Sequence, residues 1–221
     1  VKIDGSNLGS ALAGTLAATK ISANTEAGFS IVKYAGTGAV ATIAHGLSQA
    51  PELIITKTLD TNETWAVYSK PVGNTKALYL DTGEVPGTSA NFWNDTTPTA
   101  SVFTVYQSST TNASGDDYIA YCFNSIEGYS KVGSYEGNGN ADGPFVYTGF
   151  APAYVIQKIY SGGTGSWVIY DNKRGAYNLN GESLDADNNS AEVSSAVGVD
   201  FLSNGIKFRG VYAGGDTNYN T

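Results

Sequence analysis

The chain has 221 residues, with 12 basic and 20 acidic side chains and a formal net charge of -8. Only 14% of the residues are charged, whereas 41% are hydrophobic and 12% aromatic, which argues against disorder. The excess of acidic over basic residues argues against a nucleic-acid-binding protein. No apolar run reaches the ~20 residues of a membrane helix. The single cysteine, Cys122, excludes an internal disulfide framework and a cysteine-based zinc site.

Residues 1–27 are dominated by Gly, Ala, Ser and Thr. A segment of this composition buries little apolar area by itself. We therefore predict that residues 1–27 form a largely non-globular connector that partner chains stabilise. The segment has neither an initiator Met nor the pattern of a signal peptide, and we expect the chain to be part of a longer polypeptide.

From residue 28 onward, three sequence blocks occur twice in the same order. The offsets between the paired blocks are 100, 101 and 102, so both order and spacing persist. The pairs are Gly28–Gly38 with Gly128–Gly139, Ala50–Lys57 with Ala151–Lys158, and Trp65–Tyr68 with Trp167–Tyr170. This pattern indicates two tandem copies of a unit of about 100 residues, the size of a small β domain.

Within each copy the predicted strands are short and are bounded by Gly, Asn, Asp and Pro. Leu53–Lys57 and Val155–Ile159 are β-branched runs that follow a proline, and Tyr118–Phe123 is a further strand signal that follows a polar connection. No segment after residue 28 shows helical periodicity. We therefore predict an all-β protein, with β-sandwich-like repeats at 28–126 and 127–221.

The second copy lacks a counterpart of one predicted strand. In the first copy the strand Tyr118–Phe123 follows the turn at Asn112–Gly115, whereas the second copy reaches only the corresponding turn, at Asp216–Thr221. A β lobe without this strand exposes a pairing edge, which proteins normally avoid. We expect that residues beyond 221, or a neighbouring chain, complete the second lobe.

Few residues suggest chemistry. His45 is the only histidine and has no catalytic motif around it, so we predict a structural role in a turn. Asp185 and Asp187 match the first and third positions of a calcium-binding EF-hand loop. Ser190 and Ala196, however, stand at its sixth and twelfth positions, where that loop needs Gly and Glu. They are a weak calcium candidate, and a solvated acidic loop is the favoured alternative. No spacing singles out a carboxylate pair for glycoside hydrolysis, so we expect no catalytic residue and no cofactor.

The aromatic residues divide into two groups. Trp65 and Trp167 occupy equal places in the repeat and are predicted to anchor the cores. Trp93 lies among polar residues without a twin in the second copy, and Tyr177 lies in a Gly- and Asn-rich stretch. Because loops carry binding more often than core strands do, Trp93 and Tyr177 are the candidates for an exposed contact with a ligand such as a sugar.

The repeat resembles one found in virion proteins of tailed, often marine, phages. The resemblance covers about residues 22–221. It rests on the blocks Gly28–Gly38, His45–Ile55, Trp65–Tyr68, Asn112–Tyr121, Gly143–Phe150 and Asp200–Gly205. One departure is Thr148, which stands in the second copy where the first has His45. In addition, Ile3–Leu8 followed by Gly14–Leu16 is similar to the short repeats of phage tail-fibre shafts.

These resemblances imply a structural and interaction protein of a phage virion, a tail-fibre or appendage segment that contributes to host-surface attachment. They imply a homo-oligomer, a trimer if the shaft analogy holds, joined first through residues 1–27. The expected partners are other virion proteins and a host-surface glycan, with no nucleic acid and no membrane. Two alternatives stay open: a secreted carbohydrate-binding module, which would bind sugar as a monomer through Trp93 or Tyr177, and a virion polysaccharide depolymerase.

Overall fold

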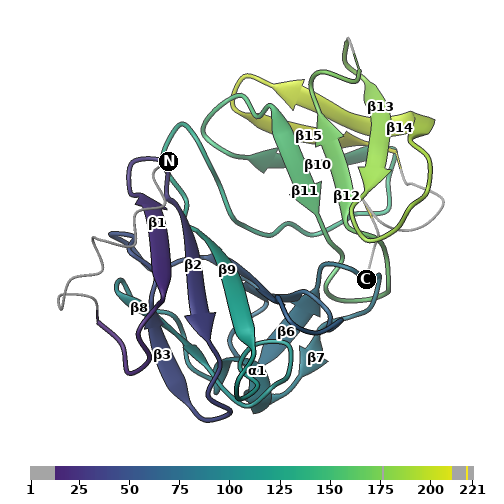
Figure 1. Cartoon of the computed structure of the whole chain (residues 1–221). Helices are drawn as coiled ribbons and strands as arrows, with labels where there is room; N and C mark the ends of the chain where they lie inside the picture. Colours follow the sequence, from purple (N-terminus) through teal and green to yellow (C-terminus); the bar gives the residue numbers. More distant parts are fainter. Residues whose placement is uncertain (1–12, 176, 211–217, 219–221) are drawn as a thin grey trace. The chain divides into compact units, whose positions relative to one another are not determined.

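A computed structural model describes residues 13–175, 177–210 and 218 and confirms an all-β, sandwich-like protein (Figure 1). All the strand pairs in its sheets are antiparallel. In chain order, the elements are β1 (Lys20–Asn24), β2 (Phe29–Ala35), β3 (Ala41–Ala44), β4 (Leu53–Thr58), β5 (Ala66–Ser69), β6 (Lys76–Tyr79), β7 (Gly87–Thr88), α1 (Ala90–Trp93), β8 (Val102–Val105), β9 (Asp117–Phe123), β10 (Asp142–Tyr147), β11 (Tyr154–Gln157), β12 (Val168–Asp171), β13 (Asn180–Asp185), β14 (Val193–Leu202) and β15 (Gly205–Arg209). No helix among the described residues is long and apolar enough to cross a membrane.

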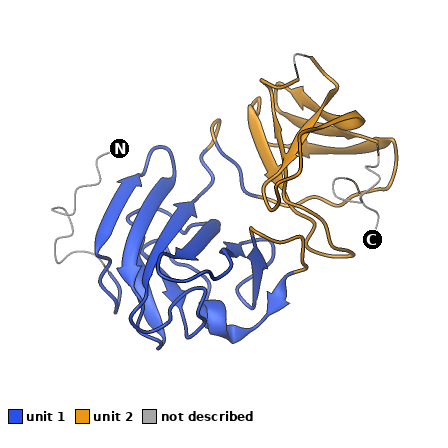
Figure 2. Ribbon diagram, turned by 45° about the vertical axis from the view of Figure 1, so that its right-hand side comes forward, with its two compact units in different colours: residues 1–79, 86–126, 130–132 blue, residues 80–85, 127–129, 133–221 orange. Residues whose placement is uncertain are grey.

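The chain forms two compact units (Figure 2). Unit 1 contains the residues up to Tyr79, Pro86–Ile126 and Ser130–Val132, and unit 2 contains Leu80–Val85, Glu127–Tyr129 and the residues from Gly133 onward. The chain passes from unit 1 to unit 2 between Ile126 and Gly133. The short excursion at Leu80–Val85 belongs to unit 2, which the repeat does not indicate.

Unit 1 is built on a seven-stranded sheet in the order β1-β2-β9-β4-β5-β6-β7. Its central strands bury every second residue, as a sheet with one covered face must; Tyr34, Ile54 and Tyr118 are 0% exposed. The strand pair β3-β8 adds Ile43 and Phe103 to the same core. The two sheets therefore pack face to face around one apolar interior.

The first strand of unit 1 contradicts the predicted connector. β1 pairs with β2 over its whole length, from Lys20↔Lys33 to Asn24↔Phe29. Ahead of it, the Leu16 N–H donates to the Thr42 carbonyl oxygen at 3.0 Å, and the Leu16 side chain packs on the core. Glycine lets the backbone at residue 14 lie close to the backbone at Thr42, because a Cβ on Gly14 would lie 2.6 Å from the Thr42 carbonyl oxygen. Residues 1–12, with the shaft-like block Ile3–Leu8, lie outside the described residues.

Unit 2 contains a six-stranded sheet in the order β10-β15-β14-β13-β12-β11. By the repeat, β11 corresponds to β4 and β12 to β5. Its core cluster is smaller than that of unit 1. The buried members are Val168, Tyr170, Val199, Ile206 and Phe208.

The repeat extends to side-chain contacts that close equivalent turns. The Lys57 Nζ donates to the carbonyl oxygen of Glu63 at 2.7 Å, in the turn that follows β4. The corresponding Lys158 Nζ donates to the carbonyl oxygen of Gly165, in the turn that follows β11. Each ammonium group thus satisfies backbone oxygens that the turn leaves without a strand partner.

Candidate functional site

Trp93 is not an exposed contact, so that prediction is wrong. Its side chain is 1% exposed and lies at the end of α1. The indole Nε1 donates to the Lys76 carbonyl oxygen at 3.0 Å, and the ring packs edge-on against Tyr68 at 5.9 Å between centroids. Polar residues cap this short helix at both ends: the Ser89 Oγ accepts from the Asn91 N–H at 3.1 Å, and Asn94 ends the helix with a φ of 51°.

Trp65 and Trp167 differ although they are equivalent in sequence. Trp167 is 6% exposed, as predicted for a core anchor. Trp65 is half-buried and is absent from the core cluster of unit 1; its ring stacks on Tyr121 with 6.5 Å between centroids and 19° between planes. Tyr121 lies between the inward-facing residues of β9, so Trp65 covers the opposite face of the sheet.

His45 has the structural role that the sequence predicts. It is 0% exposed; its Nδ1 accepts from the Leu47 N–H at 3.1 Å and its Nε2 lies 3.1 Å from the Thr99 carbonyl oxygen. This arrangement needs the neutral ring with the proton on Nε2, and burial lowers the pKa of His45. Thr148 takes the equivalent place in unit 2, where its Oγ1 accepts from the Phe150 N–H at 3.5 Å.

The weak calcium candidate gains no support. Asp187 Oδ1 accepts from the Trp167 N–H at 3.3 Å, and Asp185 Oδ2 accepts from the Asn188 side chain at 3.0 Å. The Asp187 carboxylate therefore fixes the turn between β13 and β14 to the start of β12, and the Asp185 carboxylate bonds within the turn itself. In the part of the chain that the structure describes, no group of three or more His, Cys, Asp or Glu side chains could hold a metal ion.

Tyr177 is exposed, as predicted, and it marks the candidate site. Its side chain is 86% exposed, in the loop at residues 172–179 that joins β12 to β13. Among the described residues, most of the large hydrophobic side chains that are exposed belong to unit 2. They are Val85, Tyr129, Phe145, Tyr147, Tyr154, Tyr177 and Leu179, compared with Val40 and Leu59 in unit 1.

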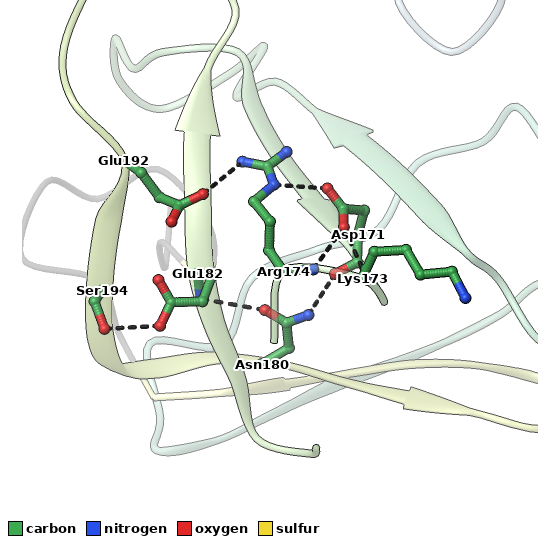
Figure 3. A network of polar contacts seen from close by, with 7 residues as sticks. All are labelled: Asp171, Lys173, Arg174, Asn180, Glu182, Glu192 and Ser194. Atoms are coloured by element: carbon green, nitrogen blue, oxygen red, sulfur yellow. Dashed lines mark hydrogen bonds and ion pairs between the residues drawn. The ribbon is translucent and has the colours of Figure 1, made fainter. Parts of the chain in front are cut away.

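The Tyr177 loop starts on a fixed carboxylate (Figure 3). Asp171 Oδ1 accepts from the backbone N–H groups of Lys173 at 2.9 Å and Arg174 at 3.0 Å. Its Oδ2 accepts from the Arg174 Nε at 2.7 Å. The pKa of Asp171 is lowered below its ordinary value, chiefly by the hydrogen bonds from the backbone N–H groups of Lys173 and Arg174. The guanidinium of Arg174 lowers it further. The carboxylate therefore stays charged and keeps the turn closed.

The guanidinium of Arg174 links the loop to the neighbouring strand. Its Nη1 lies 3.4 Å from the Glu192 Oε2, just ahead of β14. The side chain of Arg174 is 22% exposed, and its partly buried guanidinium forms ion pairs with the carboxylates of both Asp171 and Glu192. Tyr154 lies opposite Asp171 in the β11–β12 register and brings a second exposed aromatic ring to the same end of the sheet.

Two asparagines fix the far end of the loop. Asn178 Oδ1 accepts from the Phe201 N–H and its Nδ2 donates to the Phe201 carbonyl oxygen, both at 3.0 Å. Asn180 is 1% exposed, and its Nδ2 donates to the Asp171 carbonyl oxygen at 2.5 Å. The loop is therefore bonded to β12 and β14 on either side of an exposed tyrosine.

This arrangement is suited to contact with a ligand. An exposed aromatic ring held at a fixed position packs on apolar faces at a small cost in conformational entropy. The loop and the segment ahead of β14 also carry carboxylate, guanidinium and amide groups, which are bonded to one another and to the backbone. Sequence reasoning found Tyr177 but missed Asp171, Arg174 and Asn178. The run Asp171-Asn-Lys-Arg-Gly175 has the composition of a side-chain-capped turn and was the available signal.

Comparison with known proteins gives one result. A family model described as a domain of unknown function, DUF7483, matches residues 4–220. The chain belongs to the DUF7483 family. The match spans residues of both units. No curated protein and no solved structure matches the chain.

Proposed function

We propose that this DUF7483 protein is a structural and interaction component of a phage virion, a tail-fibre or appendage segment that contributes to host-surface attachment. The observation that carries the attachment role is Tyr177, whose side chain is 86% exposed on a loop held at both ends. The internal repeat, the low charge and the resemblance of the repeat to phage virion proteins support the virion setting. No catalytic activity is part of the proposal.

The ligand class that fits Tyr177 best is a surface glycan. The apolar face of a tyrosine ring packs on the C–H face of a saccharide, and the polar groups of Asp171, Arg174 and Glu192 suit hydroxyl groups. A single site of this kind binds weakly. A homo-oligomer, with a trimer favoured, would present several copies and gain avidity.

The test is binding of the full chain to immobilised bacterial surface polysaccharides, with Tyr177→Ala beside the wild type. Tyr129→Ala is the matched control, because Tyr129 is also an exposed tyrosine of unit 2, at 65%. We expect Tyr177→Ala to weaken binding at least about tenfold, or ~1.4 kcal/mol, and Tyr129→Ala to leave it unchanged. Equal binding by all three proteins, or by none of them, would remove Tyr177 as the contact.

The exposed tyrosine also suits a secreted carbohydrate-binding module, and the same assay separates the two. A module binds as a monomer, so its affinity does not depend on the number of chains in the particle. An appendage gains strength from multivalency, so dissociating the assembly should lower its apparent affinity by about 10²-fold or more. A virion depolymerase, the lesser alternative, would shorten the polysaccharide during the assay.

A further inference from the structure

Two exposed aromatic residues of unit 2 share the outer face of β10. Phe145 is 46% exposed and Tyr147 is 66% exposed. Val146, which lies between them, packs on the core of unit 2, so Phe145 and Tyr147 both point away from that core. Residues two apart on a strand are separated by about 6.8 Å. Phe145 and Tyr147 therefore form one aromatic surface, which we call the β10 platform.

Glycines leave room for both rings close to the backbone. A Cβ on Gly205, which lies opposite Tyr147 on β15, would be 2.9 Å from the Cε2 and Cζ atoms of Phe145. The Phe145 ring therefore fills the space that a side chain at residue 205 would occupy. A Cβ on Gly149 would be 3.6 Å from the Tyr147 hydroxyl oxygen. Each ring thus lies beside the backbone of a glycine.

Backbone hydrogen bonds fix the position of the platform. Residues 145–147 are all in register with β15. Directly after them, the N–H groups of Thr148 and Gly149 both donate to the Asn204 carbonyl oxygen, at 3.0 and 3.2 Å. Asn204 lies in the turn between β14 and β15. Because the backbone under the two rings is already held, binding a ligand costs little further ordering.

The charged groups next to the platform are paired with each other. Lys207 lies opposite Phe145, and its Nζ is 2.8 Å from the Asp142 Oδ1. Asp200 lies opposite Lys207, and its Oδ2 is 2.6 Å from the Arg209 Nε. Together these two cations and two carboxylates carry no net charge. The side chains of Arg209 and Asp142 are exposed, so they present hydrogen-bonding groups to a ligand.

These features favour a neutral saccharide over a protein as the ligand of the platform. The core of a protein interface is depleted of charged residues, whereas the two rings lie beside two ion pairs. A saccharide has an apolar C–H face, which packs on an aromatic ring, and hydroxyl groups, which bond to carboxylate and guanidinium groups. An anionic polysaccharide gains little from cations that nearby carboxylates already balance.

We propose that the β10 platform is a second glycan-binding surface, at which Phe145 and Tyr147 pack on successive units of a neutral polysaccharide. For its class of ligand this proposal rests on the proposed attachment function, but its residues lie outside the Tyr177 loop. Asn178 of that loop bonds to Phe201 of β14, and β15 lies between β14 and β10. Three strand spacings amount to about 14 Å, so the loop and the platform are separate contacts.

The test uses the full chain and four soluble neutral hexasaccharides, built from glucose, galactose, mannose or N-acetylglucosamine. The first readout is the NMR signals of the Phe145 and Tyr147 rings in the wild type, which needs no variant. We expect at least one hexasaccharide to shift both signals at millimolar concentration. The ring signal of Tyr177, recorded in the same titration, reports separately on the proposed attachment site.

The second readout is the affinity of variants for the hexasaccharide that shifts these signals. Phe145→Leu and Tyr147→Leu keep an apolar side chain but remove the flat ring, and both positions lie outside the core cluster of unit 2. Each should weaken binding at least about tenfold. Tyr129→Leu is the matched control, because Tyr129 is 65% exposed in unit 2 and lies outside β10. It should leave the affinity unchanged.

The outcomes separate the platform from the attachment site. Shifts at Phe145 and Tyr147 without a shift at Tyr177 would support the platform and remove Tyr177 as a contact. Shifts at Tyr177 alone would keep the attachment site and overturn the platform. The platform is also overturned if no hexasaccharide shifts the Phe145 and Tyr147 signals, or if Phe145→Leu binds as tightly as the wild type. A smaller native mass for Phe145→Leu would show that a second chain covers this face, which overturns the proposal as well.

Discussion

Asn112 and Asn218 hold corresponding turns of the two units with the same pair of backbone hydrogen bonds. Replacing either by alanine removes hydrogen bonds to a backbone N–H and a backbone carbonyl oxygen that are only partly buried, which costs about 1 kcal/mol for each hydrogen bond. We predict that Asn112→Ala destabilises unit 1 and Asn218→Ala unit 2. Amide exchange in β9 and β12 measures the two effects separately.

The exposed Asn62 provides the control for this comparison. Asn62→Ala should change the free energy of unfolding of unit 1 by less than about 0.5 kcal/mol. A loss of protection in both units after Asn112→Ala or Asn218→Ala alone would show that the units do not unfold independently. That result would contradict the prediction that each asparagine stabilises only its own unit.

Asn178 is a positioning residue for Tyr177, because it fixes the loop through two hydrogen bonds to Phe201. We predict that Asn178→Ala weakens glycan binding although the tyrosine ring remains. The accompanying loss of stability should be about 1 kcal/mol for each hydrogen bond. Tyr177→Ala, by contrast, should weaken binding with a stability change below about 0.5 kcal/mol, because the ring is exposed.

These two variants separate positioning from contact. The distinguishing measurement is the dynamics of the Tyr177 ring by NMR, which should become faster in Asn178→Ala. Full glycan affinity in Asn178→Ala, with a mobile ring, would show that loop rigidity is irrelevant to binding.

Asp171 predicts a specific acid sensitivity in unit 2. Hydrogen bonds lower its pKa in the folded state, so the charged form stabilises the fold. This contribution is complete above the ordinary aspartate pKa of about 3.9 and is lost as the pH falls through the lower, folded value. We predict that Asp171→Asn is less stable than the wild type at pH 7 and that the difference shrinks below about pH 4. A constant difference from pH 7 to pH 2, measured by amide exchange in β12, would contradict it.

Trp93 and Trp65 should respond differently to truncation. Trp93 is 1% exposed and donates a hydrogen bond, so Trp93→Ala should cost about 3–5 kcal/mol. Trp65 is half-buried on the other face of the sheet, and Trp65→Ala should cost clearly less. Chemical denaturation of the two variants gives both values. Equal losses would show that Trp65 is part of the core after all.

The strands could be predicted because alternation and repetition are local properties of the sequence. Ile54, Tyr118 and Cys122 alternate with outward-facing residues, and their burial follows from a period of two. The candidate site could be predicted only in part. Tyr177 lies between small and polar residues and is exposed, whereas Trp93 lies in a similar setting and is buried. The difference is tertiary, since α1 turns Trp93 toward Tyr68.

The remaining errors have the same origin. Ala18, at 9% exposure, is too small to mark a core position in the sequence, yet it packs in unit 1 close to β1. Asn178 and Phe201 are 23 residues apart, and their contact depends on how β13 and β14 are placed. No short-range pattern carries that information.

The central claim is that this chain acts as one subunit of an oligomeric virion appendage. The most direct test compares the mass of the native assembly, in the absence of denaturant, with the mass of the denatured chain. We predict a ratio of three, which would give each particle three Tyr177 loops. A ratio of one, unchanged across the concentrations used for binding, would contradict the claim and leave the monomeric carbohydrate-binding module as the better account.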